Sequence, residues 1–418
     1  MNNHTHQTQF HSSVVRYAPL IWLAGLSSVA YQLAALWSAI RSGGKIVRPN
    51  AMQIVVYSYC AVYATSIGIA AIEGADILRV LAALYNLSIW VSGAILLGTA
   101  GLTHHDSVRR SARMTLVVLF VLAVGSYFAF GSQGSVRLNS LLGFAINADA
   151  LPENLAANTN LHMTSVDWST LGLGSRVSVL APYPTASGML AVVLLALSAP
   201  ASLTRSSALR YCIYIALAIV VCMLCASRAA VASAFLYCAL LGLFYVARVS
   251  KSQSFKAAIV CLIIISVLLA SSLLSEAISA LWSTVNSSRS DSSSLRFMLY
   301  TRSVSSAWAE HPLLGFGIKE RVSELAIPLG SHSTFFGAMY KTGLIGGLVV
   351  TLFFLLVTKT SFAAGFRSRC DYRSSLAAGC IAMLPLLIFE DLDSVPLVAY
   401  TFFLMIALVS RRSAIEQR

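Results

Sequence analysis

Charged side chains are scarce in this sequence. Only 11% of its 418 residues are charged, while 57% are hydrophobic. An ordinary soluble domain carries about 25% charged residues, so this composition excludes that class. Strand-like alternation of apolar and polar residues is also missing, which excludes an outer-membrane barrel. The sequence therefore predicts an all-α, polytopic integral membrane helix bundle, because helices satisfy their backbone hydrogen bonds within lipid.

Residues typical of redox or metal centres are few. Most of the eight cysteines lie inside apolar runs, where cysteine behaves as a small hydrophobe. Cys222 and Cys225 are one helical turn apart within such a run. We expect no structural disulfide, no metal site and no cofactor. The N-terminus lacks the features of a cleavable signal peptide, so we expect the first apolar run to remain as an anchor.

The net charge of +13 does not indicate nucleic-acid binding. Most basic residues lie in short loops between apolar runs, and these loops alternate along the chain. This is the pattern of loops that face the cytoplasm. The opposite, external side, which would be the periplasmic side in a bacterial inner membrane, then holds residues 132–184, residues 276–334 and the acidic turn "EDLD" at 390–393.

Apolar runs divide the chain into membrane spans. We expect about 11–12 transmembrane helices in a single membrane domain, residues 1–418. Residues 132–184 form a periplasmic segment, and 276–334 a large, partly helical periplasmic loop that carries part of the active site. The eleven predicted spans are residues 17–40, 51–71, 78–102, 114–131, 185–204, 208–226, 229–247, 257–275, 335–358, 374–389 and 395–410.

Arginines stand out on the periplasmic side, where the positive-inside rule does not account for them. Arg228 lies in "CASRAAVASAF" between two apolar runs. It is either an interfacial side chain reaching to lipid headgroups or an anion ligand, since guanidinium suits phosphate oxygens bidentately. Arg296 opens the helical part of the large loop, and Arg176 lies in a Gly- and Pro-containing segment before a span; solvated charges are the alternative for both.

One histidine is placed at the mouth of an apolar helix. His332 begins "HSTFFGAMYKTGLIGG". Nearby arginines would keep its imidazole neutral, which makes it a competent general base, although a structural role is the alternative. Asp391 and Asp393 lie in the acidic turn on the same side. They either mark an interface loop or supply a carboxylate that orients an imidazole or balances an arginine.

Three motifs follow one another along the chain, and their order is informative: "SRAA" at 227–230, "LRFMLYTRSVSSAWAEHPLLGFG" at 295–317 and "HSTFFGAMYKTGLIGG" at 332–347. Together they resemble the O-antigen ligase and polymerase superfamily of bacterial envelopes. The motifs cover roughly residues 180–360, and the layout of spans extends the likeness along the chain. Within the superfamily, the layout is most similar to the lipopolysaccharide O-antigen ligases.

The resemblance implies an enzyme of the bacterial inner membrane. Such ligases transfer polysaccharide from undecaprenyl pyrophosphate to a sugar hydroxyl of lipid A–core at the periplasmic face, without metal or nucleotide. The expected partners are undecaprenyl pyrophosphate-linked O-antigen, lipid A–core and membrane lipids. The two lipid substrates would enter a cavity roofed by residues 276–334.

The family's residues map onto this chain by motif. The family histidine falls on His332, its arginines on Arg228 and Arg296, and its late aspartate on Asp391 or Asp393. Two further positions depart from the family.

Arg176 precedes "APYPTASG", which resembles a Pro-Asn segment of relatives with the Asn replaced. Tyr300 stands where Trp is frequent. An O-antigen polymerase, a protein O-oligosaccharyltransferase and a non-enzymatic lipid or anion transporter remain as alternatives.

Overall fold

A computed structural model describes most of the protein. The described residues are 10–41, 50–100, 105–146, 151–165, 176–249, 290–320, 328–368 and 370–410. The predicted span 257–275 and parts of the large loop, 276–289 and 321–327, lie outside them.

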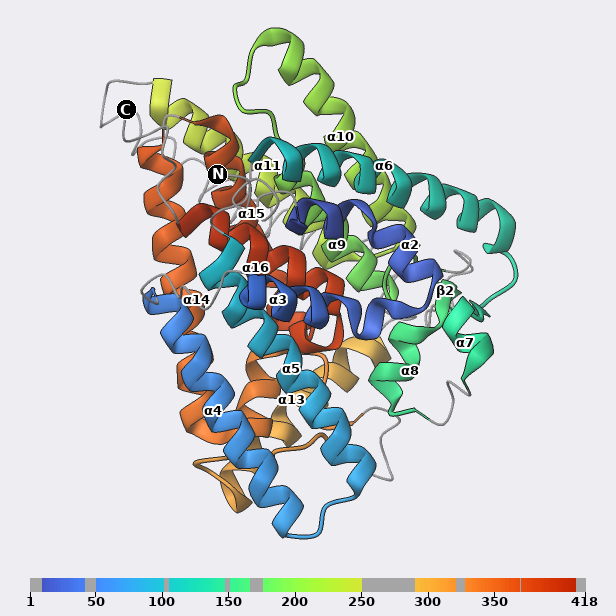
Figure 1. The fold of residues 1–418 in the computed structure, drawn as a ribbon, viewed down its shortest axis with the longest axis vertical. Coiled ribbons are helices and arrows are strands. Elements are labelled where there is room, and N and C mark those ends of the chain that lie inside the picture. Colours follow the sequence, from blue (N-terminus) through green and yellow to red (C-terminus); the bar gives the residue numbers. More distant parts are fainter. Residues whose placement is uncertain are drawn as a thin grey trace.

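Helices dominate the described residues, which confirms the predicted all-α membrane bundle (Figure 1). The helices are α2 (Ala18–Leu23), η1 (Leu26–Ser28), α3 (Ala30–Arg41), α4 (Ala51–Ile72), α5 (Ile77–Thr99), α6 (His105–Phe130), α7 (Leu141–Ala145), α8 (Glu153–Thr159), α9 (Pro184–Ser198), α10 (Arg205–Leu224), α11 (Arg228–Val249), α13 (Ser290–Glu310), α14 (Thr334–Arg367), α15 (Asp371–Phe389), η4 (Leu392–Ser394) and α16 (Pro396–Ser410).

Seven of the described helices are long and apolar enough to cross a membrane: α4, α5, α6, α10, α11, α14 and α15. The shorter apolar helices α9 and α16 are enclosed almost completely by the others. A helix that is apolar all round belongs in such a position, because it has no polar face to present. The two therefore form the centre of the bundle.

The first predicted span, 17–40, is not one continuous helix. It is divided into α2, η1 and α3, with the break at Gly25, whose φ is +78°. A Cβ at Gly25 would lie 2.8 Å from the carbonyl oxygen of Thr159. The prediction of a single span was wrong because the hydropathy of this run does not show that residues 140 and 159 pack against its middle.

The segment 132–184 contains a small sheet that the sequence did not predict. Strands β1 (Val136–Leu138), β2 (Leu161–Ser165) and β3 (Arg176–Val177) pair antiparallel in the order β1-β2-β3. Ser165 pairs with Arg176, so the sheet fixes the backbone of that arginine just before α9 begins. The strands are too short for a periodic signal in the sequence.

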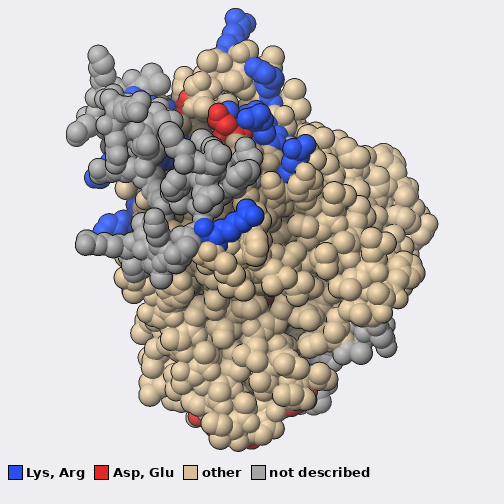
Figure 2. All heavy atoms as spheres, in the orientation of Figure 1, with Lys and Arg blue, Asp and Glu red and all other residues tan. Residues whose placement is uncertain are grey.

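Basic side chains gather at one end of the bundle. Blue side chains occupy the upper part of Figure 2, whereas its lower and right-hand parts are almost free of them. At this end, Arg248 of α11 pairs with Asp371 of α15, and Arg113 of α6 donates to the carbonyl oxygen of Ser198. Since α14 ends and α15 begins here, the start of α14 and the end of α15 lie at the opposite end.

Candidate active site

His332 lies directly before α14, at the end of the bundle opposite the basic one. Its backbone has φ +61°, a left-handed conformation that is uncommon for a non-glycine residue. The Tyr300 hydroxyl of α13 donates to the His332 carbonyl oxygen at 2.7 Å. The Tyr300 ring also stacks on Phe336, with ring centroids 4.8 Å apart. Helix α13 therefore holds the histidine backbone in place from outside the bundle.

The His332 imidazole is neutral at physiological pH. Burial, together with the positive charges of Arg296 and Lys319, lowers its pKa to about 4. A neutral imidazole can accept a proton, although its basicity is weaker than that of an exposed histidine. Arg296 and Lys319 are therefore close enough for their charges to act on this side chain.

Arg296 pairs with Glu390, the first of the three carboxylates in the acidic turn, one of which was expected from the sequence to balance an arginine. Its Nη2 lies 3.4 Å from Oε1 of Glu390, the residue that ends α15. Glu390 also accepts a side-chain hydrogen bond from Thr185, and Arg176 acts on its charge. Burial raises the pKa of the Glu390 carboxyl group, while Arg296, Thr185 and Arg176 oppose that rise.

Arg176 connects this pair to the turn that precedes Arg228. The Nε of Arg176 donates to the carbonyl oxygen of Cys225 at 3.1 Å. The chain then turns at Ala226, whose φ is +46°, and α11 begins at Arg228. Arg176 therefore contacts the turn before Arg228 and also acts on the charge of Glu390.

Asp391 and Asp393 contact lysines. Asp391 pairs with Lys319, and Asp393 lies 2.5 Å from the Nζ of Lys341, with both cross distances at 3.8 Å. Trp90 also donates to Asp393 at 3.3 Å. Among the described residues, the ion-pair partners of the two aspartates are therefore lysines, and neither aspartate forms an ion pair with an arginine or a histidine. In the described residues, the carboxylate of this turn that pairs with an arginine is Glu390.

The two aspartates share one buried environment. Burial and the neighbouring charge of Asp393 raise the pKa of Asp391 to about 6, against the pull of Lys319 and Lys341. Burial alone would raise the pKa of Asp393 too, but the two lysines hold it below its usual range. We call these four residues the lysine–aspartate cluster: Lys319, Lys341, Asp391 and Asp393.

Helix α14 is broken close to this cluster. Gly343 has φ +61° and ψ −161°, which no helix accommodates. The break frees backbone groups, and the segment 312–317 pairs with them. The four hydrogen bonds, with their lengths, are Phe316 N to Tyr340 O (3.0 Å), Gly317 N to Lys341 O (2.8 Å), Leu344 N to Pro312 O (2.8 Å) and Ile345 N to Leu313 O (3.3 Å).

Glycines make this pairing possible. A Cβ at Gly343 would lie 2.3 Å from the carbonyl carbon of Leu313, and a Cβ at Gly315 2.4 Å from the carbonyl oxygen of Tyr340. The motifs "PLLGFG" and "KTGLIGG" are therefore two halves of one backbone clamp. In the sequence, the signal for this clamp was the presence of isolated glycines inside an apolar helix.

The turn 390–393 is also fixed to the start of α14. Thr334 donates to the Glu390 carbonyl oxygen twice, from its backbone N at 3.0 Å and from its hydroxyl at 2.8 Å. Leu392 N donates to the Thr334 hydroxyl oxygen at 3.0 Å. His332 and the acidic turn consequently form one rigid unit.

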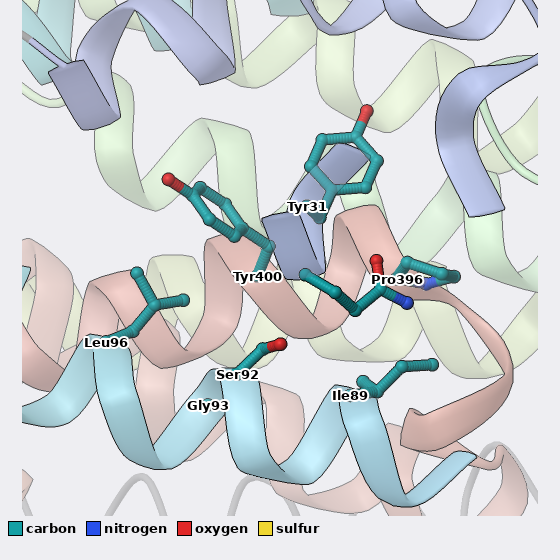
Figure 3. A pocket seen from close by; sticks show the side chains of 8 residues that line it. Tyr31, Ile89, Ser92, Gly93, Leu96, Pro396 and Tyr400 are labelled. Carbon is teal, nitrogen blue, oxygen red and sulfur yellow. The ribbon is translucent and has the colours of Figure 1, made fainter. Parts of the chain in front are cut away.

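A small cavity lies elsewhere, between α3, α5 and α16 (Figure 3). Figure 3 shows Ile89, Ser92 and Leu96 extending from α5 toward the helices that carry Tyr31 and Tyr400. The cavity volume of about 10 Å³ suits a single water molecule and excludes a sugar. The residues that were expected to roof a substrate cavity, 276–289 and 321–327, lie outside the described part of the chain.

Comparison with known proteins supports the resemblance found in the sequence. Residues 213–351 match the family model described as O-Antigen ligase. The match includes His332, Arg228 and Arg296, whereas Arg176 and the turn 390–393 lie outside it. Among curated proteins, none matches the chain. The match covers about a third of the chain and includes all three motifs, which supports membership of the O-antigen ligase superfamily.

Proposed function

We propose that this protein is an O-antigen ligase. It transfers polysaccharide from undecaprenyl pyrophosphate to a sugar hydroxyl of lipid A–core at the periplasmic face of the inner membrane. The observation that carries the proposal is the grouping of neutral His332 with Arg296, Arg176 and Glu390 at one end of a multi-pass bundle. His332 and the two arginines each have a role in the transfer.

The orientation rests on charge. Arginines and lysines crowd the end where α14 finishes and α15 begins, and basic ends face the cytoplasm (Figure 2). The site end then faces the periplasm. The two lipid substrates of a ligase stand in the outer leaflet of that membrane, so their head groups reach this depth.

The reaction is a displacement at the anomeric carbon of the donor sugar. The acceptor hydroxyl oxygen forms a bond to that carbon, and the bond from the carbon to the phosphate oxygen breaks. His332 takes the hydroxyl proton as general base, a role that contributes about 10²–10⁴-fold. A direct displacement inverts the anomeric centre.

The arginines act on the leaving group. Undecaprenyl pyrophosphate departs with the bridging oxygen and one more negative charge than it had as an ester. Arg296 and Arg176 bind its phosphate oxygens and stabilise that developing charge. Arg228 extends the cationic surface on the side of the α10–α11 turn.

Deleting the gene and analysing lipopolysaccharide on a gel tests the proposal. The ligase reaction predicts lipid A–core without any O-antigen, together with accumulated lipid-linked polymer. A core carrying a single repeat would identify a polymerase instead. Unaltered lipopolysaccharide with altered glycoproteins would identify a protein-directed transferase, and loss of the lipid-linked polymer itself at the periplasmic face would identify a transporter.

Complementation assigns the histidine. His332→Ala should fail to restore ligation while the protein accumulates normally in the membrane. His105→Ala is the matched control, because His105 begins α6 at the opposite end, and it should restore ligation fully. Normal O-antigen attachment by His332→Ala would contradict the role of His332 as base.

A further inference from the structure

The acidic turn contains ion pairs of two kinds. Glu390, Asp391 and Asp393 are all buried, with 2%, 4% and 1% of their surface exposed. The aspartates are held by lysines at close range, and Lys341 is itself only 1% exposed. No ligand can reach between these partners without dismantling the interior of the bundle.

The pair Arg296–Glu390 differs in geometry. Its single contact is 3.4 Å long, and the Arg296 side chain is 33% exposed. A carboxylate and a guanidinium can form two parallel hydrogen bonds near 2.8 Å. This pair makes one long contact, so the guanidinium has donors left for another anion.

The backbone of Glu390 is fixed while its side chain need not be. Thr334 holds the carbonyl oxygen through two hydrogen bonds, and the carboxylate reaches Arg296 and Thr185. Arg176 acts on the same carboxylate. The positive charges of two arginine side chains therefore act on the Glu390 carboxylate, and they would also stabilise phosphate oxygens near Arg296.

We propose that Glu390 is an internal counter-anion that the donor's phosphates displace from Arg296. This inference rests on the proposed ligase function and adds a competing carboxylate to its donor site. In the empty protein, Glu390 keeps Arg296 in position and neutralises it. Pyrophosphate, with more than one negative charge and several oxygens, takes its place, while a weaker anion does not.

The displaced carboxyl group does not become an unpaired buried charge. Thr185 remains as a hydrogen-bond partner, and the raised pKa of Glu390 allows the group to take up a proton from water. Displacement therefore costs less than it would for Asp393, whose charge the two lysines stabilise.

Binding measurements on the full chain in phosphatidylcholine nanodiscs test this role. Glu390→Gln should bind undecaprenyl pyrophosphate about three- to tenfold more tightly than the unaltered protein, because a partly exposed ion pair of this kind is worth about 1 kcal/mol. Glu73→Gln is the matched control. Glu73 is exposed at the end of α4, and its change should leave affinity unaltered.

Two further arms separate the outcomes. Glu390→Asp keeps the charge but is one methylene shorter, so it should tighten binding by a smaller factor and covers the case in which Glu390→Gln does not fold. Inorganic pyrophosphate should show the same order of affinities without a lipid tail, and nanodiscs with phosphatidylglycerol show whether a lipid headgroup competes.

Equal or weaker pyrophosphate binding by both variants overturns the counter-anion role, whatever the reaction. Tighter inorganic pyrophosphate binding by a chain that does not ligate O-antigen supports the counter-anion role and contradicts the ligase reaction.

Discussion

One turn of four residues, "EDLD", contributes to two regions that differ in purpose. The lysine–aspartate cluster is deeply buried, with Asp391 and Asp393 each in contact with a lysine. The pair Arg296–Glu390 lies at the edge of the bundle, with one long contact and a third of the arginine exposed. The difference teaches that a carboxylate near a candidate site is not thereby part of its chemistry: enclosed pairs position the backbone, and open pairs can exchange partners.

Removing a lysine from the buried lysine–aspartate cluster should have the largest effect on stability. Lys341→Ala removes the closer of the two lysines that stabilise the buried charge of Asp393, so we expect a loss of about 3–5 kcal/mol in the free energy of unfolding. Lys359→Ala is the control on the same helix, since Lys359 is exposed. Denaturant unfolding in detergent micelles measures both. Equal stability of the two variants would show that the cluster is not needed for folding.

The backbone clamp supports the cluster from its other side. Gly343→Ala places a Cβ against the Leu313 backbone at a positive φ, which should cost about 1–3 kcal/mol of stability. Gly68→Ala in α4 has open space and should stabilise by up to about 1 kcal/mol. Thermal unfolding of both variants tests for these opposite signs. A shared sign would indicate that α14 does not depend on the clamp.

Changes to Arg296, in its partly exposed pair with Glu390, should reduce activity and leave folding intact. Arg296→Lys keeps the charge and loses the planar fork, so ligation should fall about tenfold or more with unfolding unchanged within about 0.5 kcal/mol. Initial rates of transfer at limiting donor, together with unfolding curves, measure the two effects. A stable variant with full activity would remove Arg296 from the donor site.

The smallest expected effect is on the pH profile. The pKa of His332 is about 4, below its ordinary 6.5, so kcat/KM should not lose its base near pH 6.5 and should fall only as the pH approaches 4. The contribution of His332 to stability changes with pH in the same direction as kcat/KM. Between pH 6.5 and 4 the unfolded chain binds the extra proton, so the contribution of His332 to stability falls as the pH falls.

Arg296→Gln should shift the acidic limb of the kcat/KM profile to higher pH, because it removes one of the two cations that lower the pKa of His332. Initial rates from pH 4 to 8 check both statements. A limb that stays near pH 6.5 in the unaltered protein would mean that the imidazole is not enclosed as described.

The sequence by itself determined the fold class of the protein and pointed to its candidate site residues. Apolar runs of about 20 residues dictate helices in lipid, because the backbone has no other partner there. The motifs around Arg228, Arg296 and His332 led to the O-antigen ligase superfamily, and the match over residues 213–351 confirms it. These features are local, so a linear pattern records them.

Only the tertiary structure decided which charges pair and where helices break. Arg296 and Glu390 are 94 positions apart, and Lys341 and Asp393 are 52 apart. Three carboxylates within four residues look equivalent in a sequence, yet packing gives one an arginine and two a lysine each. The breaks at Gly25 and Gly343 likewise depend on partners from distant segments. A glycine permits a break, but the break persists only where another part of the chain fills the space and satisfies the freed backbone groups.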